Sequence, residues 1–331
     1  MRIRGRSPKS RSTHYPLCAP KRRGPIALLF WLVLGSVWLA ACGSSTPVVQ
    51  SVSTTTPAAR VTQRATSSAT TNMTAEPRPG AISIAGWNVG MDDADPAVIA
   101  QEIAAIDDID LWGLAEVNQA NLAGRLEQAA EQGEGADFAH VLGQSGSGMR
   151  LLAIYDADRF ELLGSSEIDA INTTGNARAP LVLDLRDRAS GLRFLFMVNH
   201  LYRSREEERH QQARLLAAWA ATQTLPVLAV GDYNFDWETQ GGATDHDLGY
   251  DLMTTGGVWQ WIKPAILTTT QCSGWPCRYN SVLDFIFAAG AARTWPAASA
   301  IVVRPGDFPD DTTTSDHRPV MAWFWPPAQL P

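Results

Sequence analysis

Polar side chains of the kinds that bind metal ions and transfer protons stand at the ends of short apolar runs in this sequence. Gly231-Asp232-Tyr233-Asn234 follows the run 226–230, which is too short for a helix and is typical of a buried strand. Asn88, Glu116 and His200 hold similar positions after other apolar runs. Side chains at strand ends tend to converge on one edge of a sheet, so these residues could form a catalytic site if their strands are neighbours.

Asp284 differs from these residues because it lies within an apolar run, 282–287, that reads as a strand. A buried carboxylate without a partner is costly, so Asp284 requires a cation, a metal ion or a protonated His nearby. Asp316-His317 precedes the last apolar run, 320–324. A Glu or a His at the end of one strand is by itself more typical of a surface or structural position, so the inference depends on convergence.

The elements that must position these groups are strands that come in runs, with helices between some of them. Strands are predicted over 81–89, 110–117, 138–142, 150–155, 160–168, 181–185, 192–198, 226–230, 282–287, 300–303 and 320–324. Helices are predicted over 95–106, 119–132 and 206–222, and a long loop region over 235–280. Because strands and helices do not strictly alternate, we expect two packed sheets with helices outside them.

Six motifs in this order resemble the endonuclease/exonuclease/phosphatase superfamily, which includes pancreatic deoxyribonuclease, abasic-site endonucleases, bacterial sphingomyelinases and inositol-polyphosphate 5-phosphatases. The motifs are Trp87-Asn88-Val89, Leu114-Ala115-Glu116-Val117, Asn199-His200-Leu201, Gly231-Asp232-Tyr233-Asn234, Leu283-Asp284-Phe285-Ile286-Phe287 and Ser315-Asp316-His317-Arg318-Pro319. The resemblance covers residues 81–325. It implies a four-layer α/β/β/α sandwich with two packed mixed sheets, and metal-assisted hydrolysis of a phosphoester.

The resemblance also implies a role for each group that would act on the metal ion or on protons. Glu116 would be the main ligand of Mg²⁺ or Mn²⁺, and Asn88 would assist through its amide oxygen. Both offer the hard oxygen atoms that Mg²⁺ prefers. His317 would act as a general base or as an acid that stabilises the phosphate, held by Asp284. Asp316 could ligate the metal or support this network.

The remaining site residues would act on the water and the phosphate. By the same resemblance, Asp232 would orient the attacking water, Asn234 would contact the phosphate, and His200 would donate a hydrogen bond to a phosphate oxygen. Arg178 stands where relatives often place a basic phosphate contact, although a solvated loop Arg is an equal alternative.

The first 42 residues have the layout of an export signal. They hold eight of the chain's 27 Lys and Arg residues and no acidic residue, and an apolar run follows at 25–41. Leu39-Ala40-Ala41-Cys42-Gly43 resembles the lipobox of bacterial lipoproteins, in which the Cys becomes the lipidated N-terminus. We therefore expect residues 1–42 to be a lipoprotein signal peptide and Cys42 to anchor an exported protein to the membrane. The alternatives are a buried thiol in an uncleaved helix and a chance match.

Residues 43–80 are rich in Ser, Thr and Pro and poor in large apolar residues. Such a segment cannot bury enough surface to offset its chain entropy, so we expect a disordered linker. The catalytic domain is then predicted over 81–327, and we expect it to be monomeric.

The charge of the chain bears on the substrate class. Past residue 42 there remain 19 basic and 34 acidic residues, a formal net charge of −15, which opposes non-specific binding to nucleic acid. The basic set Arg203, Arg205, Arg209 and Arg214 partly restores a nuclease interpretation, although Glu206-Glu207-Glu208 interrupts it and could pair with it. A nuclease is the first hypothesis, and a phosphoesterase for lipid headgroups or small molecules is the second. A lipoprotein that only binds a partner is the third.

Several further features carry expectations of their own. Cys272 and Cys277 are close in sequence, and a small disulfide loop is favoured in an exported protein because a zinc site would need more ligands. Asp245-His246-Asp247 lies in a Gly-rich segment and is expected to be a solvated turn, and His210 is expected on an exposed helix face. The Trp residues near the C-terminus are interpreted as core or rim packing, with a stacking platform for a base or sugar as the alternative.

Overall fold

The computed structural model describes residues 80–90, 93–118, 120–239, 245–272, 277, 281–308 and 313–327. The expected signal peptide, the anchor Cys42 and most of the expected linker lie outside these residues. Within the described part, no helix combines the length and the apolar character needed to cross a membrane.

Within the described residues, the strands form two mixed sheets of six strands each. The first sheet, in the order β11-β12-β1-β2-β4-β3, contains β1 (Ile82–Asn88), β2 (Leu111–Val117), β3 (Phe138–Leu142), β4 (Arg150–Asp156), β11 (Ala297–Ile301) and β12 (Val320–Phe324). The second, in the order β5-β6-β7-β8-β10-β9, contains β5 (Phe160–Glu167), β6 (Leu181–Asp187), β7 (Arg193–His200), β8 (Val227–Glu238), β9 (Trp259–Trp261) and β10 (Ser281–Ala289).

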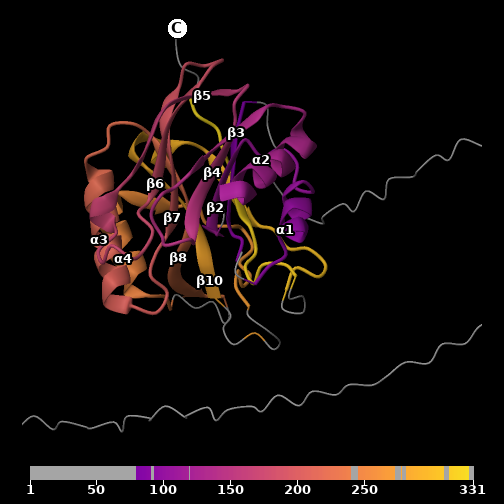
Figure 1. Ribbon diagram of the computed structural model, residues 1–331. Coiled ribbons are helices and arrows are strands. Elements are labelled where there is room, and N and C mark those ends of the chain that lie inside the picture. Colours follow the sequence, from indigo (N-terminus) through magenta and orange to yellow (C-terminus); the bar gives the residue numbers. More distant parts are fainter. Residues whose placement is uncertain are drawn as a thin grey trace, which may run out of the picture. The chain divides into compact units, whose positions relative to one another are not determined.

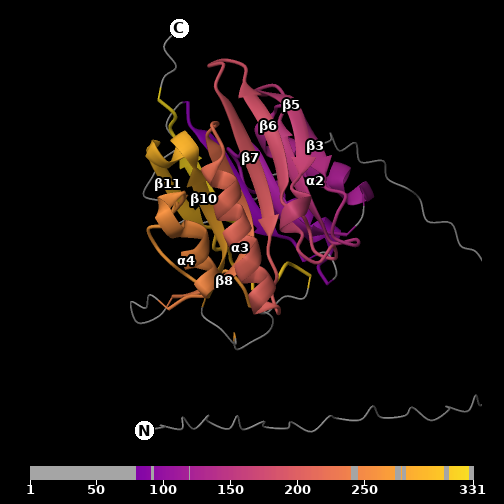
Figure 2. The same cartoon turned by 90° about the vertical axis from the view of Figure 1, so that its left-hand side faces the viewer.

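Helices cover the outer faces of the two sheets. They are α1 (Pro96–Ile103), α2 (Ala120–Glu134), α3 (Glu206–Ala221) and α4 (Leu248–Thr254), with short 3₁₀ turns η1 (Asp169–Ile171), η2 (Thr255–Gly257) and η3 (Gly290–Thr294). Figures 1 and 2 show α1 and α2 on the side of the first sheet and α3 and α4 on the side of the second. The expected four-layer α/β/β/α sandwich is therefore confirmed.

Each sheet contains one parallel pair of strands, and these two pairs position the site. β1 and β2 run parallel and are joined through α1, while β7 and β8 run parallel and are joined through α3. The other neighbouring strands of both sheets are antiparallel. Because the carboxyl ends of a parallel pair lie at the same edge, each pair delivers two of the predicted site residues together.

The two sheets approach each other closely at these central strands. One buried cluster contains side chains of both sheets, including Ile84 of β1 and Val198 and Val230 of the second sheet. A Cβ atom at Gly113 of β2 would lie 2.2 Å from Cγ2 of Val230, so only glycine fits at that point of contact. This packing holds the ends of both parallel pairs in fixed relative positions.

The expectation of a long loop over 235–280 is wrong in its first half. β8 does not stop at Gly231 but continues to Glu238, and α4 and β9 follow it. Tyr233, Phe235 and Trp237 alternate along this extension and point into the core. That alternation with period two is visible in the sequence, but the polar residues between the aromatic ones obscured it.

Gly231 should be intolerant of any side chain. Its φ is +149°, and a Cβ atom there would lie 2.0 Å from the carbonyl oxygen of Asn199 on the neighbouring strand β7. We expect Gly231→Ala to lower the free energy of unfolding by about 3 kcal/mol, measured by chemical denaturation. Gly164→Ala on β5, where a Cβ meets no atom within 4 Å, is the matched control. Equal stability of the two variants would contradict this account.

Candidate active site

The carboxyl ends of the two parallel pairs meet at one cleft of about 890 Å³. Asn88 ends β1, and Glu116 is the last residue but one of β2. His200 ends β7, and Asp232 lies within β8. These four side chains line the cleft together with Arg178, Asn234, Asp316 and His317. The structure thus gathers the predicted residues of the folded part, with Asp284 directly behind His317.

Local irregularities in the strands orient two of these side chains. Glu116 has a φ of +63°, and the pairing of β2 with β4 shifts register between Leu114 and Val117. Asn234 has a φ of +53° within β8. A bulge of this kind changes the direction of a side chain and is often found next to an active site.

His317 and Asp284 form a buried hydrogen-bonded pair. Nδ1 of His317 lies 2.8 Å from Oδ2 of Asp284, whose side chain is only about 1% exposed. Burial by itself lowers the pKa of His317, but the charge and the hydrogen bond of Asp284 outweigh it and raise that pKa to about 10. His317 is therefore protonated at neutral pH, which satisfies the buried carboxylate in the way the sequence required.

The backbone around His317 is held by the first sheet. The main-chain amide of His317 donates to Oγ of Ser315, and that hydroxyl donates to the carbonyl oxygen of Asn88. The indole of Trp87 donates to the carbonyl oxygen of His317. The segment before β12 is thus attached to the end of β1, which fixes His317 relative to the residues of both sheets.

Asp232 and His200 face each other beneath the cleft. Nε2 of His200 lies 3.5 Å from Oδ2 of Asp232, which also accepts a hydrogen bond of 3.2 Å from the amide of Asn88. Burial, with the nearby charges of Asp284 and Glu116, raises the pKa of Asp232 to about 7 against the opposing charge of His317. Burial lowers the pKa of His200 well below its usual value, with help from the charges of Arg178 and other cations. His200 is therefore neutral at pH 7.

Arg178 lies in the cleft and not in a solvated loop. Its Nε donates to the carbonyl oxygen of Met149 at 2.7 Å, and its Nη2 lies 3.6 Å from Oε1 of Glu116. Its side chain is about 20% exposed. The guanidinium of Arg178 thus lies beside the carboxylate of Glu116, which the family resemblance implies as a metal ligand.

Asp316 lies at the rim of the cleft and has a partner that sequence reasoning missed. Nε2 of Gln271 donates to Oδ2 of Asp316 at 2.6 Å, and Oδ1 lies 3.9 Å from Nε2 of His317. Next to Gln271, Cys272 and Cys277 form a disulfide with a Cα–Cα distance of 5.0 Å, and the amide of Cys272 donates to the carbonyl oxygen of Asp316. A single Gln far from any motif gives no sequence signal for this contact.

The oxygen-bearing side chains that line the cleft fit a hard divalent cation. Glu116, Asp232 and Asp316 offer carboxylate oxygens, and Asn88 offers an amide oxygen. No described residue donates a hydrogen bond to the carboxylate of Glu116, whose nearest cationic groups are 3.6 Å and 3.7 Å away. An all-oxygen set with one unsatisfied carboxylate suits Mg²⁺ or Mn²⁺, which take few protein ligands and keep several waters.

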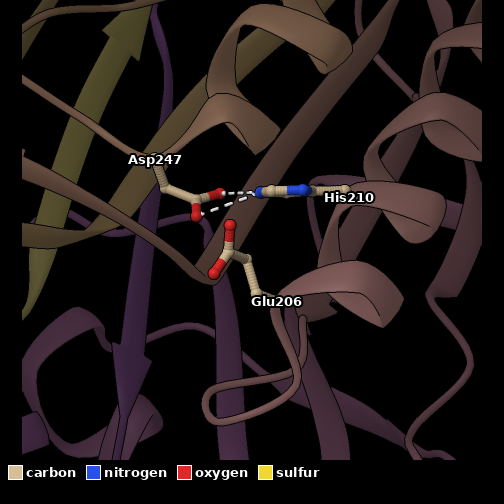
Figure 3. Close-up of side chains that lie close together, drawn as sticks. All are labelled: Glu206, His210 and Asp247. Atoms are coloured by element: carbon tan, nitrogen blue, oxygen red, sulfur yellow. Dashed lines mark hydrogen bonds and ion pairs between the residues drawn. The ribbon is translucent and has the colours of Figure 1, made fainter. Parts of the chain in front are cut away.

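The expectations for His210 and for Asp247 are wrong. His210 is only 4% exposed, and its Nε2 lies 3.1 Å from Oδ2 of Asp247 (Figure 3). The same carboxylate also accepts a hydrogen bond from Arg209. Asp247 caps α4 by accepting a hydrogen bond from the amide of Gly249. Of the expected solvated turn 245–247, only Asp245 is exposed. Sequence reasoning missed this cluster because it joins α3 to a segment 37 residues away, with no shared motif.

The described Trp residues near the C-terminus pack in the protein and do not line the cleft. Trp259, Trp261 and Trp323 are buried, and the indole of Trp259 donates to the carbonyl oxygen of Leu216. Trp275 lies outside the described residues. The core-packing interpretation therefore accounts for these three residues.

Comparison with known proteins points to one family. The model of the Endonuclease/Exonuclease/phosphatase family matches residues 85–317, which span both sheets and the predicted site residues from Asn88 to His317. A search of curated protein sequences finds no significant match.

Solved structures of low sequence identity share the fold. An endonuclease/exonuclease/phosphatase family protein from Bacteroides thetaiotaomicron is 17% identical, with a TM-score of 0.58 over 76% of this chain and 100% of that one. The mannosyl-6-phosphatase Bt3783 of the same species is 18% identical, with a TM-score of 0.56 over 73% and 99% of the two chains. D. rerio TDP2 in complex with a single-stranded DNA product is 20% identical, with a TM-score of 0.57 over 74% and 98%.

Proposed function

This chain belongs to the endonuclease/exonuclease/phosphatase family, and from that membership we propose that it is a phosphodiesterase that uses Mg²⁺ or Mn²⁺. The family consists of divalent-metal-dependent hydrolases of phosphoesters. The observation that carries the proposal is the buried His317–Asp284 pair, which faces Asp232 across the same cleft that Glu116 lines.

We assign the metal ion to Glu116, with the amide oxygen of Asn88 and the carboxylate of Asp316 in support. A cation held there would neutralise charge on the phosphate and lower the pKa of a bound water. Arg178 and the neutral His200 would hold phosphate oxygens. Nε2 of His200 lies near the carboxylates of Glu116 and Asp232, where the metal ion and the phosphate would meet. Asn234 donates to the carbonyl oxygen of Leu201 and keeps the adjoining wall of the cleft in place beside the phosphate.

The protonation states separate the two possible roles of His317. With a pKa raised to about 10, His317 holds a proton at neutral pH and can stabilise the phosphate or donate to the leaving oxygen. Asp232, with a pKa raised to about 7, loses its proton in the working range and can orient the attacking water. We therefore assign His317 as the acid and Asp232 as the group that accepts from water.

The charge of the protein favours a short or small phosphoester over a long duplex. The cations that line the described cleft are Arg178, Arg203 and His317, and two of these already face carboxylates. The strongly acidic body would repel a polyanion beyond the site. Small phosphodiesters and short single strands are therefore better substrate candidates than long nucleic acid. The structures of similar fold include a TDP2 complex with a single-stranded DNA product and a mannosyl-6-phosphatase, which are compatible with these two substrate classes.

A substrate panel tests the proposal. Bis-p-nitrophenyl phosphate, a short single-stranded oligonucleotide, plasmid DNA, RNA, sphingomyelin and inositol phosphates would each be incubated with Mg²⁺, with Mn²⁺ and with a chelator. We expect metal-dependent turnover of the small diester and the oligonucleotide, and much slower turnover of plasmid. Metal-independent turnover, or none on any substrate by a folded protein, would refute the proposal.

We further propose that the enzyme acts outside the cytoplasm, anchored through a lipid on Cys42. The basic region, the apolar run and the lipobox-like sequence before Cys42 support this. In a bacterial host, Cys42→Ala should leave an unprocessed or soluble protein, measured by mass spectrometry of the membrane and soluble fractions. Unchanged membrane attachment with the same mature mass would contradict the anchor.

A further inference from the structure

The segment 201–205 forms one wall of the cleft directly after His200. Leu201, Tyr202, Arg203 and Ser204 all line the cleft. This segment leaves the second sheet at the end of β7 and enters α3 at Glu206. Its side chains therefore stand beside the phosphate position, where the remainder of a substrate would extend.

The backbone of this wall is fixed by buried side chains of α3. Nη1 of Arg209 donates to the carbonyl oxygens of Tyr202 and Arg203, at 2.9 Å and 2.8 Å. Oε1 of Gln212 accepts from the amide of Tyr202 at 3.0 Å. Gln212 is completely buried and Arg209 is 8% exposed. Such planar side chains can hold a turn in one conformation, because several bonds act on two adjacent residues.

Arg209 is itself held by an anion on its far side. Nη2 of Arg209 lies 2.5 Å from Oδ2 of Asp247, and His210 contacts the same carboxylate. Figure 3 shows Asp247 reaching toward His210 and Glu206 from the segment that precedes α4. Without Asp247, the buried guanidinium of Arg209 would have no counter-charge among the described residues. The segment before α4 therefore helps α3 to fix the wall 201–205.

Arg203 is the one guanidinium of the described cleft lining that forms no ion pair and no side-chain hydrogen bond with any described residue. Arg178, the other, contacts Glu116 and Met149. The alternative that Glu206-Glu207-Glu208 pairs with the basic set does not hold for Arg203, which forms no ion pair with these acids among the described residues. The positive charge of Arg203 nevertheless contributes, after burial, to lowering the pKa of His200.

We propose that Arg203 is a specificity-determining residue that binds a second anionic group of the substrate, and that Arg209 is the positioning residue that holds it there. The second group is a phosphate or carboxylate on the same small molecule or on the next nucleotide. This inference rests on the proposed function, because it takes the first phosphate to lie at Glu116 and His317. The proposal accounts for the buried hydrogen bonds that Arg209 and Gln212 form with the backbone next to the exposed side chain of Arg203.

A binding experiment without turnover tests the inference. The probes are propylphosphonate, with one anionic group, and propane-1,3-diphosphonate, with two, and neither can be hydrolysed. Dissociation constants are measured calorimetrically on the full chain in Mg²⁺ for the wild type, Arg203→Ala, Arg203→Lys, Arg209→Lys and the control Arg214→Ala. Arg214 is an exposed arginine of α3 that does not line the cleft, so its loss changes the net charge equally.

We expect the wild type and Arg214→Ala to bind the diphosphonate about tenfold more tightly than the monophosphonate. Arg203→Ala should lose this preference, Arg203→Lys should keep most of it, and Arg209→Lys should weaken it although Arg203 is intact. A wild-type ratio near one, or a ratio unchanged in Arg203→Ala, would overturn the inference. Lack of turnover in the substrate panel with the binding preference intact would overturn only the proposed function.

Discussion

His317→Ala should lower kcat by about 10³-fold while leaving the fold intact, because general acid catalysis commonly contributes that much. His317 is the only described His of the cleft that is protonated at neutral pH, and Asp284 behind it maintains that state. The measurement is steady-state hydrolysis of bis-p-nitrophenyl phosphate, with thermal denaturation as the check on folding.

The control for this variant is His140→Ala, which removes a partly exposed His of β3 that pairs with Glu127 of α2. It should retain nearly full activity. A folded His317→Ala enzyme with more than about a tenth of wild-type kcat would contradict the acid role of His317.

The pH profile gives an independent test of the same pair. Because the raised pKa of His317 is about 10, wild-type activity should fall as pH rises through that value, where the acid loses its proton. Asp284→Asn removes the charge that raises the pKa, so its activity should decline at a lower pH as well as being smaller at its maximum. An alkaline limit at the same pH in Asp284→Asn would show that the carboxylate does not set the protonation of His317.

Glu116→Gln should also reduce activity by about 10³-fold, by weakening metal binding and charge neutralisation. The substitution keeps the shape of the side chain and removes one negative charge from a site where no described residue donates to that carboxylate. The fall should be accompanied by a much weaker affinity for Mn²⁺, measured calorimetrically or from the spin-resonance signal of the free ion.

Glu161→Gln is the matched control, since Glu161 is partly exposed on β5 and pairs with Arg186 away from the cleft. Its Mn²⁺ affinity and activity should equal those of the wild type. If Glu116→Gln binds Mn²⁺ as tightly as Glu161→Gln does, the metal ion is held by other residues, and Asp232 and Asp316 become the candidates.

The strand-end residues could be recognised from sequence because strand ends leave local marks. An apolar run followed by polar residues indicates where a buried strand reaches the edge of its sheet, as at Asn199-His200 at the end of β7. The same mark at Gly231-Asp232 lies within β8, which continues to Glu238. The need of Asp284 for a partner could be predicted for a thermodynamic reason, since a carboxylate in an apolar strand requires a charged partner. The partner proved to be His317, 33 residues away.

The contacts of Arg209, His210 and Gln271 could not be predicted in the same way. Each joins segments that the sequence separates by tens of residues, as His210 and Asp247 or Gln271 and Asp316 do. A helix pattern rich in charges looks exposed whether or not another element covers it. Burial of His210 therefore depends on α4, whose own position follows from the unpredicted extension of β8.

The sequence by itself determined two packed sheets with helices outside them, because periodicity is written in neighbouring residues, and its six motifs carried the resemblance to the family. Tertiary structure alone decided which of the polar groups in these motifs share a proton, which carboxylate is left unsatisfied, and which arginine faces the cleft without a partner. Those properties depend on burial and on distances between elements. They arise only when the two parallel strand pairs pack against each other at Gly113 and Val230.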